Sequence, residues 1–330
     1  MAKGQVYKIH SDFYYLNSEN GVHECKIRDV LKKQDKKIYV GDYVEFENGY
    51  ITQILERKNF IPRPSVANVD QVIIVSAVQE PELDFNQLNR YIAFAEYYNL
   101  DIKLCFNKND LSADDKLIEK VFSIYEPLGY DIVFTSALEG LEIDSFAKIM
   151  ENKVSVLCGQ SGVGKSSLIN SLNPEFDLKT KSVSEKTLRG THTTRHCEIM
   201  TISDTVKIID TPGFSNLKFD FMLPHDVYKL FREFRPYQNC CKYQDCLHIH
   251  EDGCKILEDI NKFDETRYNS YVEFVEEAKE YKEKIKYQGK KIESRFKQTH
   301  NKTAVKISVN KRQGSRRTKK QDLYKEMEDE

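Results

Sequence analysis

The sequence lacks any apolar run long enough to cross a bilayer. Its longest clean apolar stretch is about Val72 to Val78, whereas a membrane-spanning helix needs about 20 apolar residues. The N-terminal stretch MAKGQVYKIHSDFYY has no apolar core of signal-peptide length. A lipid anchor and an amphipathic membrane helix are missing as well. These absences predict a soluble intracellular protein that has no membrane partner.

A large excess of one charge is also missing. Lys and Arg total 50 and Asp and Glu total 52, so the formal net charge is −2 and the whole molecule is not a polycation. The stretch from Asn301 to Lys320 is nevertheless strongly basic and contains no acidic residue, while the final residues EMEDE are acidic. We interpret this stretch either as an RNA-binding arm or only as a solubilising end.

The size and composition predict two or three folded domains, because 40% of the 330 residues are apolar. Residues 1–62 contain five short extended segments, with the turn VGDYV before the fourth. They predict an N-terminal closed β-barrel of the oligonucleotide-binding (OB) type. The alternative is another kind of small β-domain.

Residues 63–222 have an α/β pattern that follows the linker-like stretch RKNFIPRP. The apolar strand VDQVIIVSA and the later strands DIKLCF, DIVFTSA, VSVLC and VKIIDTPG alternate with helical segments. This alternation predicts an α/β sheet that is covered by helices on both faces.

Residues 223–290 are predicted to form a helical domain, and residues 291–330 form the basic C-terminal extension. Two apolar stripes at helical spacing are interpreted as core positions. They comprise Val227, Leu230, Phe231 and Phe234, followed by Tyr268, Tyr271, Val272 and Val275.

The segment GQSGVGKS matches the phosphate-loop pattern G-x-x-x-x-G-K-[ST] between a strand and a helix. Its glycines allow backbone N–H groups to surround phosphate oxygens, and the helix N-terminus adds partial positive charge. We expect Lys165 to reach the β- and γ-phosphates and the Ser166 hydroxyl to bind Mg²⁺. The nucleotide-binding residues predicted here are Gly159, Gln160, Ser161, Gly162, Val163, Gly164, Lys165, Ser166 and Ser167.

Two further segments are expected to respond to the γ-phosphate. IIDTPG places Asp210 at the end of an apolar strand, where its carboxylate can act through Mg²⁺, and the Gly213 amide can meet the γ-phosphate. The threonine-rich segment RGTHTTRH precedes this strand. We expect Thr193 or Thr194 to bind Mg²⁺ in a loop that orders around it, and the alternative is an ordinary surface loop.

The segment NKND indicates guanine recognition. The Asp110 carboxylate can accept hydrogen bonds from guanine N1–H and N2–H₂, whereas adenine would leave it unpaired. Asn107 can contact O6 and brace neighbouring loops, and the stem of Lys108 can cover the base. The segment TSA at the end of the next strand, with Ser136 and Ala137, can present backbone N–H to O6.

Along the chain the order is NKND (the base reader), TSA (the base loop), the phosphate loop, RGTHTTRH (switch I) and DTPG (switch II). Ordinary GTPases begin with the phosphate loop. The same sheet can form if the original termini were joined and the chain opened elsewhere, because domain termini often lie close together. The sequence therefore predicts a circularly permuted GTPase domain. We also expect motion of switch II, after Gly213, to be transmitted to the C-terminal helical domain.

Four of the eight cysteines are crowded between residues 240 and 254. In a reducing compartment this crowding favours a metal over disulfides. We expect a closed, structural zinc site formed by Cys241, Cys246, His248 and Cys254. The spacing alone would also allow Cys240 or His250 to replace one of these four ligands. The alternative to a metal site is that the cysteines form disulfides or are free thiols.

This combination resembles the RsgA/YjeQ family of circularly permuted GTPases that depend on the small ribosomal subunit. The resemblance covers about residues 1–290, and the motifs that carry it are VGDYV, NKND, GQSGVGKSSLIN, GTHTTRH, DTPGF and C-x4-C-x-H-x5-C. It implies a cytoplasmic, monomeric GTP hydrolase that acts late in maturation of the small (30S) subunit and is stimulated by it. It also implies contacts with ribosomal RNA, and GTP or GDP, Mg²⁺ and one structural Zn²⁺ as cofactors.

The resemblance further implies a catalytic role for His192, together with Lys165, Thr193 and Thr194; a solvated loop histidine is the alternative. Phe214 follows DTPG where Ras-like enzymes carry a water-orienting glutamine, so we expect slow intrinsic turnover. Relatives often carry a basic residue before the histidine, and this sequence departs from them with GTH at that place. The alternative functions are an RNA-binding module that uses guanine nucleotide as a structural ligand, and another RNA-, tRNA- or membrane-associated GTPase.

Overall fold

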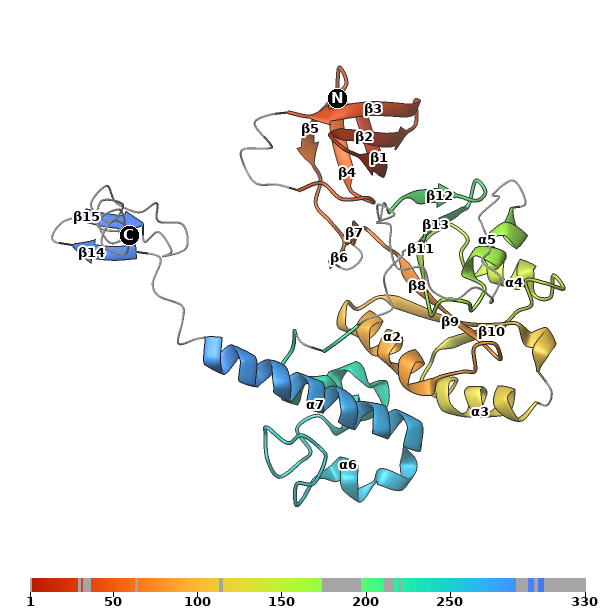
Figure 1. Ribbon diagram of the computed structural model, residues 1–330, viewed down its shortest axis with the longest axis vertical. Helices are drawn as coiled ribbons and strands as arrows, with labels where there is room; N and C mark the ends of the chain where they lie inside the picture. Colours follow the sequence, from red (N-terminus) through yellow and green to blue (C-terminus); the bar gives the residue numbers. More distant parts are fainter. Residues whose placement is uncertain are drawn as a thin grey trace, which may run out of the picture. The chain divides into compact units, whose positions relative to one another are not determined.

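The structure is a computed structural model that describes residues 2–28, 31, 37–62, 65–112, 115–173, 197–210, 217–219, 221–288, 296–299 and 302–305. The chain divides into two compact units, Met1–Ala278 and Lys279–Glu330. The first unit contains a β-barrel and a central α/β domain (Figure 1), followed by a part that carries a cluster of cysteine and histidine residues. The predicted fold class is therefore confirmed.

The N-terminal part is a closed five-stranded barrel. Its strands are β1 (Ala2–His10), β2 (Phe13–Ser18), β3 (Gly21–Ile27), β4 (Tyr43–Glu47) and β5 (Tyr50–Ile54). They pair in the order β1-β2-β3-β5-β4, and β1 closes the ring by pairing with β4. The β3–β5 pair is parallel and the other pairs are antiparallel. Val6, Leu16, Val44 and Ile51 are fully buried in its interior.

The VGDYV turn joins the barrel to the segment that follows it. Gly41 has φ +93°, and a Cβ atom there would lie 1.9 Å from the carbonyl oxygen of Ala67, so only glycine fits. The buried Asp42 carboxylate accepts hydrogen bonds from the Arg57 guanidinium at 2.6 and 2.9 Å. The motif thus fixes the barrel to the start of the linker.

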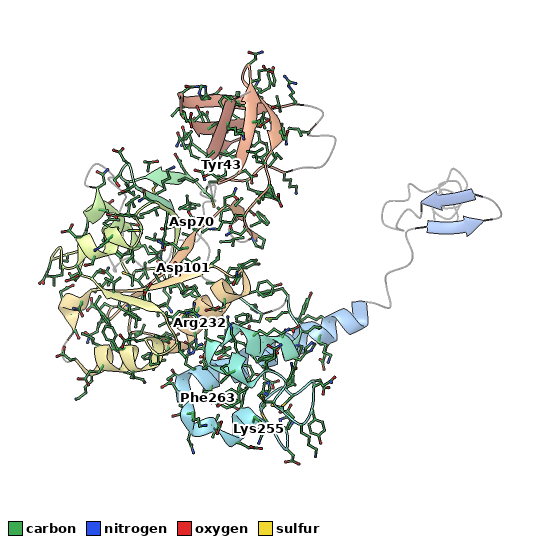
Figure 2. The ribbon with its side chains drawn as sticks, turned by 180° about the vertical axis from the view of Figure 1, so that it is seen from behind. Tyr43, Asp70, Asp101, Arg232, Lys255 and Phe263 are labelled. Carbon is green, nitrogen blue, oxygen red and sulfur yellow. The ribbon has the colours of Figure 1, made fainter. Side chains whose placement is uncertain are left out.

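The predicted linker contains a short antiparallel hairpin of β6 (Phe60–Pro62) and β7 (Ser65–Ala67). The domain limit expected at residue 62 falls between these two strands. Asp70, labelled in Figure 2, then accepts hydrogen bonds from the Lys58 ammonium at 3.0 Å and from the backbone N–H of Val154 at 2.8 Å. These bonds connect the linker to the central domain.

The central domain contains a six-stranded sheet. Its strands are β8 (Gln71–Ala77), β9 (Asp101–Asn107), β10 (Asp131–Phe134), β11 (Lys153–Cys158), β12 (Ile199–Thr201) and β13 (Val206–Asp210). They are arranged in the order β10-β9-β8-β11-β13-β12, and β12 alone is antiparallel to its neighbour. The strand before the phosphate loop, β11, thus lies between an earlier and a later strand, as the permuted motif order predicts. The sequence did not predict β12, which is only three residues long.

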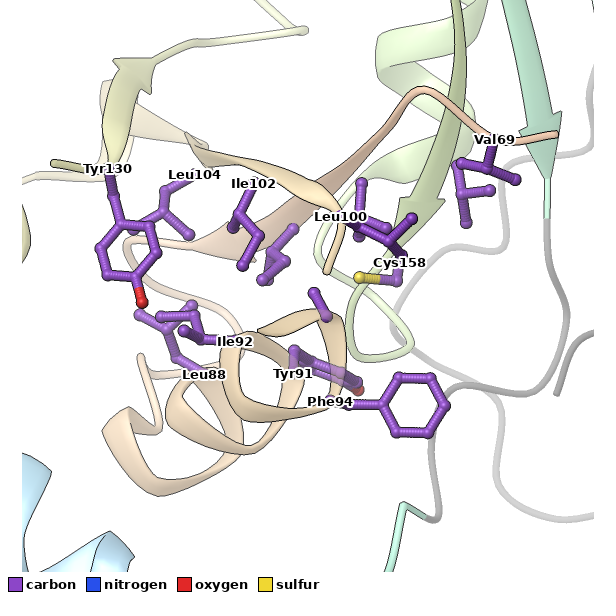
Figure 3. Close-up of a cluster of buried hydrophobic side chains, with 14 of the residues drawn as sticks. Val69, Leu88, Tyr91, Ile92, Phe94, Leu100, Ile102, Leu104, Tyr130 and Cys158 are labelled. Carbon is purple, nitrogen blue, oxygen red and sulfur yellow. The ribbon is translucent and has the colours of Figure 1, made fainter. Parts of the chain in front are cut away.

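Helices cover both faces of this sheet. They are α2 (Phe85–Tyr97), α3 (Lys116–Tyr125), α4 (Ile143–Lys148) and α5 (Lys165–Leu172). Ile74 of β8 packs in one core with residues of α2 and α3, and the α2 side of this core is shown in Figure 3. The neighbouring Ile73 packs with residues of α4 and α5 in a second core. The predicted two-sided sheet is confirmed.

The last part of the first unit is made of short helices around α7. The 3₁₀ segments are Pro224–Leu230, Arg232–Tyr237 and Ile260–Lys262, and the α-helices are α6 (Lys255–Glu258) and α7 (Glu265–Gln288), which continues into the second unit. The stripe from Val227 to Phe234 is buried as expected, but its helical spacing does not correspond to one α-helix. Phe231 has φ −110° and ψ 110°, an extended conformation that separates two 3₁₀ segments, and Pro236 removes a backbone donor from the second.

The second unit contains an antiparallel hairpin of β14 (Phe296–Thr299) and β15 (Lys302–Val305). The remainder of the basic stretch up to Lys320 lies outside the described residues. Within the described ranges, no helix has both the length and the apolar character needed to span a membrane.

Candidate nucleotide site and metal cluster

Three loops meet at one edge of the central sheet. Asn107 is the last residue of β9, Thr135 follows β10 and Gly159 follows β11. Because these strands are parallel, their carboxyl ends lie at the same edge, where α/β proteins commonly bind ligands. The NKND motif and the phosphate loop therefore lie close together although Asn107 and Val163 are 56 positions apart.

The phosphate loop has a backbone shape that requires glycine at both ends. Gly159 has φ +146°, and a Cβ atom there would lie 2.0 Å from the carbonyl oxygen of Val75. Gly164 has φ +94°, and its Cβ would lie 2.2 Å from Nδ2 of Asn107. Helix α5 begins directly afterwards. The tight loop therefore depends on both glycines.

The other predicted residues of this loop differ in exposure. Val163 is buried, Ser161 and Gly162 are exposed, and Ser166 and Ser167 are half-buried in the first turn of α5. The Lys165 ammonium donates hydrogen bonds to the loop's own carbonyl oxygens, those of Gly159 at 2.8 Å and Gln160 at 2.7 Å. The ammonium group of Lys165 thus lies against the phosphate loop, where it was predicted to bind the β- and γ-phosphates.

The side-chain amide of Asn107 connects the three loops. It is 1% exposed, and its Nδ2 donates to the carbonyl oxygen of Val163 at 2.9 Å. Its Oδ1 accepts hydrogen bonds from the backbone N–H of Ala137 at 3.1 Å and from the Thr135 hydroxyl at 3.3 Å. One buried amide therefore holds the phosphate loop, the NKND segment and the TSA segment together.

Asp110 lies beside the TSA segment in a short 3₁₀ turn, Asn109–Leu111. Its Oδ1 accepts a hydrogen bond from the Ser136 hydroxyl at 2.5 Å, which orients the carboxylate. Lys108 has φ +63°, and this left-handed residue turns the chain between the strand and the 3₁₀ turn. Its ammonium donates to the carbonyl oxygen of Glu80. The structure therefore brings all five predicted base-site residues to one place.

The loop before α2 also borders this site, which the sequence analysis missed. Besides the Glu80 carbonyl, this loop contributes Pro81 and Leu83 to a small pocket that Gln160 and Val163 of the phosphate loop also line. Its position after β8, a central parallel strand, is the signal that could have identified it, because such loops lie at the carboxyl edge of the sheet.

Part of the predicted site lies outside the described residues. His192, Thr193, Thr194, Gly213 and Phe214 belong to this part, and of Asp210 only the backbone is described. Asp210 ends β13 and is paired in register with Leu157 of β11. Its main chain is thus next to the strand that leads into the phosphate loop.

The second candidate site is a cluster of three cysteines and one histidine. The ligand atoms of Cys241, Cys246, His248 and Cys254 all lie within 4.8 Å of one another. Nδ1 of His248 is 3.5 Å from Sγ of Cys241 and 3.3 Å from Sγ of Cys254, and those two sulfur atoms are 3.9 Å apart. The exposed residue Cys240, by contrast, directs its Sγ at the carbonyl oxygens of Pro236 and Gln238.

The loop that carries these residues is held by specific hydrogen bonds. The Tyr268 and Tyr271 hydroxyls of α7 donate to the carbonyl oxygens of His248 at 2.9 Å and Leu247 at 2.6 Å. Burial would raise the pKa of Glu251, but backbone N–H groups of Ile249, Leu247 and His250 stabilise the carboxylate and lower its pKa to about 2. The loop therefore has the rigidity that a metal site needs.

The cluster fits a tetrahedral zinc ion. Zinc binds sulfur at about 2.3 Å and nitrogen at about 2.1 Å, so the edges of the ligand tetrahedron should be about 3.5 to 3.8 Å long. The separations of Cys241, His248 and Cys254 are close to these values. Burial raises the pKa of the Cys246 thiol to about 12 and lowers the pKa of His248, so zinc would have to displace thiol protons.

Family models match most of the chain. A model described as "RsgA GTPase" matches residues 54–220, and one described as "RsgA N-terminal domain" matches residues 3–52. A third model, described as "50S ribosome-binding GTPase", matches residues 154–311.

Curated relatives match over almost their whole length. A Bacillus cereus protein named "Small ribosomal subunit biogenesis GTPase RsgA" is 39% identical over 292 residues, which are 86% of this chain and 99% of the relative. A protein of the same name from Alkaliphilus metalliredigens is 37% identical over 288 residues, which are 84% of this chain and 98% of the relative.

Solved structures match at a similar coverage. A crystal structure of YjeQ from Thermotoga maritima has a TM-score of 0.74 and 35% identity, with 84% of this chain and 98% of that chain covered. A crystal structure of YloQ, described as a circularly permuted GTPase, has a TM-score of 0.71 and 30% identity, with 85% and 96% covered. These similarities agree with the permuted strand order of the central sheet.

Proposed function

This chain belongs to the RsgA family of GTPases, and we propose from this membership that it hydrolyses GTP during maturation of the small ribosomal subunit. Relatives that match over almost their whole length are named small ribosomal subunit biogenesis GTPases. The family model whose description mentions the 50S subunit matches only residues 154–311 and does not include the N-terminal part of the chain. The small subunit is therefore the partner that we propose.

The single observation that carries this proposal is the hydrogen bonding of Asn107, which joins the phosphate loop to the NKND and TSA segments. In the proposed pocket, the Asp110 carboxylate accepts hydrogen bonds from N1–H and N2–H₂ of guanine. The Ala137 N–H, which donates to Oδ1 of Asn107, would exchange this partner for O6 of guanine, and the stem of Lys108 covers the base. The Ser136 hydroxyl keeps Asp110 in position through their 2.5 Å hydrogen bond.

The phosphate loop is proposed to bind the triphosphate. The Lys165 ammonium exchanges its two carbonyl partners, Gly159 and Gln160, for oxygens of the β- and γ-phosphates. Asp210 ends β13 beside Leu157 of β11, and Ser166 lies in the first turn of α5, which follows the loop after β11. Both positions suit a shared Mg²⁺ site with Thr194. When bound, Mg²⁺ neutralises charge on the phosphates.

The residues proposed for the hydrolytic step are His192, which orients the attacking water, and Lys165, Thr193 and Thr194, which contact the phosphates or Mg²⁺. Phe214 cannot orient water by hydrogen bonding, so hydrolysis in the absence of a partner should be slow. The small subunit is proposed to stimulate it by fixing the residues around the γ-phosphate.

The cysteine–histidine cluster is proposed to be a structural zinc site. Three thiolates and one imidazole would complete the four-fold coordination of zinc and would leave no position for a substrate. The zinc charge would stabilise the thiolates, and the ion would fix the loop from Cys241 to Cys254 against α7. Zinc is therefore expected to stabilise this domain and to take no part in hydrolysis.

We propose that the chain works as a cytoplasmic monomer with four parts. These are the barrel (1–62), the GTPase domain (63–222), the zinc-binding domain (223–290) and the basic extension (291–330). The barrel and the zinc-binding domain are proposed to contact ribosomal RNA. The basic extension would add phosphate contacts whose strength decreases with salt.

The test is phosphate release from GTP by the purified full-length protein, alone, with small ribosomal subunits and with large subunits. We expect slow release by the protein alone and an increase of at least about tenfold with small subunits. A Lys165→Ala variant measures contaminating hydrolysis. No increase with small subunits, or an equal increase with large subunits, would contradict the proposal.

A further inference from the structure

Helix α2 contacts α7 of the zinc-binding domain and also lines the small pocket beside the phosphate loop. Two of its neighbouring residues, Asn89 and Arg90, are directed at the zinc-binding domain. Leu88 and Tyr91, on the other side of the same turn, line the small pocket together with Gln160 and Val163 of the phosphate loop. Successive residues of an α-helix are about 100° apart around its axis, so the same turn of α2 faces both α7 and the small pocket.

Arg90 is the main connection on the side of the zinc-binding domain. Its side chain is 9% exposed and forms ion pairs with Glu273 at 2.7 Å and Glu277 at 2.8 Å, both on α7. It donates to the carbonyl oxygen of Leu217 at 3.1 Å, and its guanidinium lies 4.6 Å from the ring centre of Phe274. A buried cation with this many partners has essentially one position.

The same ion pair holds the chain segment that leaves the central domain. The Glu277 carboxylate accepts a hydrogen bond from the backbone N–H of Phe219 at 3.1 Å, while Arg90 binds the carbonyl of Leu217. Residues 217–219 are therefore fixed between α2 and α7. A displacement of α7 relative to the central domain would act directly on α2.

The other side of α2 is connected to the nucleotide pocket. Asp84 caps the helix by accepting a hydrogen bond from the backbone N–H of Gln87 at 3.1 Å, and both residues line the small pocket. In the preceding loop, the Glu80 carbonyl accepts a hydrogen bond from the Lys108 ammonium. A shift of the first turns of α2 would therefore change the environment of the phosphate loop and of the base-reading lysine.

We propose that α2 couples the zinc-binding domain to the nucleotide pocket, and that Arg90 is the positioning residue of this coupling. The inference deepens the proposed function and rests on it. When a partner of the zinc-binding domain displaces α7, the pair of Arg90 with Glu273 and Glu277 moves α2, and the phosphate loop changes its affinity for nucleotide. Arg90 itself does not contact the nucleotide.

The chain offers a matched control at the other end of α2. Arg232 pairs with Glu96 at 2.6 Å, donates to the carbonyl oxygens of Leu128 at 3.1 Å and Gly129 at 2.9 Å, and lies 4.0 Å from the ring centre of Tyr130. It thus has the same kinds of partners as Arg90. Glu96 lies six residues further along the helix than Arg90, about 9 Å along its axis, and does not line the pocket.

The experiment compares Arg90→Gln with Arg232→Gln in the full-length, zinc-loaded protein. The melting temperature reports the structural effect, and the dissociation rate of a fluorescent GDP reports the nucleotide pocket. We expect both variants to melt at a lower temperature. Arg90→Gln should release GDP at least about fivefold faster than wild type, which corresponds to a typical coupling between sites, and Arg232→Gln less than about twofold faster.

Equal GDP release by wild type and Arg90→Gln, or equal acceleration by both variants, would overturn the inference. Should Arg90→Gln fail to fold, Glu277→Gln is measured instead with the same two outcomes. A wild-type protein that binds no guanine nucleotide would refute the proposed function itself, so the two failures are distinguishable. Restoration of slow GDP release by Arg90→Lys would show that the cationic charge at this position sets the coupling.

Discussion

At the scale of single residues, the nucleotide pocket depends on a close contact between a glycine and an amide. Gly164 leaves room for Nδ2 of Asn107, which in turn donates to the carbonyl oxygen of Val163. The P-loop pattern predicts a glycine here, but it gives no reason for the second motif to be adjacent. That reason is tertiary, because it arises from the pairing of β11 with β8 and of β8 with β9.

Substitution of Gly164 by alanine should therefore disrupt nucleotide binding. The new Cβ would lie 2.2 Å from Nδ2 of Asn107, so the amide must leave Val163. We expect nucleotide affinity, measured by calorimetric titration of GDP, to decrease at least about tenfold, because a buried hydrogen bond is lost and an amide is left unpaired. Gly140→Ala is the control, since Gly140 also has a positive φ but nothing lies within 4 Å of its Cβ position. An equal loss in both variants would contradict this explanation.

The choice of base should depend on the Asp110 carboxylate. Asp110→Asn replaces one acceptor by an N–H₂ donor, so binding of guanine should weaken by about 10- to 100-fold, as expected for hydrogen bonds to a charged group. Xanthine, which has a carbonyl in place of the guanine amino group, should bind better to the variant than to wild type. Competition titrations with GTP and xanthosine triphosphate measure both effects, with the exposed Asp144→Asn as a control. Undiminished preference for GTP would refute the base assignment.

At the scale of secondary-structure elements, the sequence predicted those whose pattern is local. Strand β8 reads as a buried strand because all of its residues are apolar or small, apart from Gln71. By contrast, β12 is too short to carry a pattern, and the helical stripe around Phe231 became two 3₁₀ segments. The stripe identified buried residues correctly because residues three positions apart lie on the same side of the chain in both 3₁₀ and α-helical turns.

The partners of the VGDYV turn could not be predicted from the sequence. Its Asp42 is recognisable only as a turn residue, yet it is completely buried and pairs with Arg57. Similarly, the spacing of the cysteines left Cys240 and His250 as substitutes. The structure brings together Cys241, Cys246, His248 and Cys254.

The proposed zinc site predicts different behaviour for the nearby residues Cys246 and Cys240. Cys246→Ser should abolish binding of one zinc per chain and lower the melting temperature, because structural zinc contributes directly to folding. Cys240→Ser should retain zinc and stability, since Cys240 is exposed and directed away from the cluster. Zinc content by elemental analysis of the purified variants measures this difference. Retention of a full zinc equivalent by Cys246→Ser would show that the ligand set is wrong.

At the scale of the whole molecule, buried ion pairs connect the zinc-binding domain to the GTPase domain. A still more buried cation at this boundary is Arg267 of α7, which is 1% exposed and pairs with Glu233 of the same domain at 2.8 Å. It also donates to the Asn89 side chain of α2 at 3.0 Å. Residues 217–219, which follow switch II, are held by Arg90 and Glu277. The expected motion of switch II would therefore have to act on these two contacts to reach the C-terminal domain.

Removal of the Arg267 charge should strongly destabilise the first unit. Arg267→Met keeps much of the side-chain volume but leaves Glu233 as an uncompensated buried charge, which typically costs about 3–5 kcal/mol. Denaturant unfolding monitored by circular dichroism measures the loss. Lys262→Met, in the exposed pair with Asp259, is the control and should leave the midpoint nearly unchanged. Similar effects of both substitutions would contradict the importance of the buried pair.

The central claim is that a permuted chain forms one guanine-nucleotide switch that acts on the small ribosomal subunit. Co-sedimentation of the full-length protein with ribosomal subunits tests this claim most directly, with a non-hydrolysable GTP analogue or GDP present. We predict that the protein pellets with small subunits in the presence of the analogue and stays largely in the supernatant with GDP. Equal pelleting with both nucleotides, or a preference for large subunits, would contradict it.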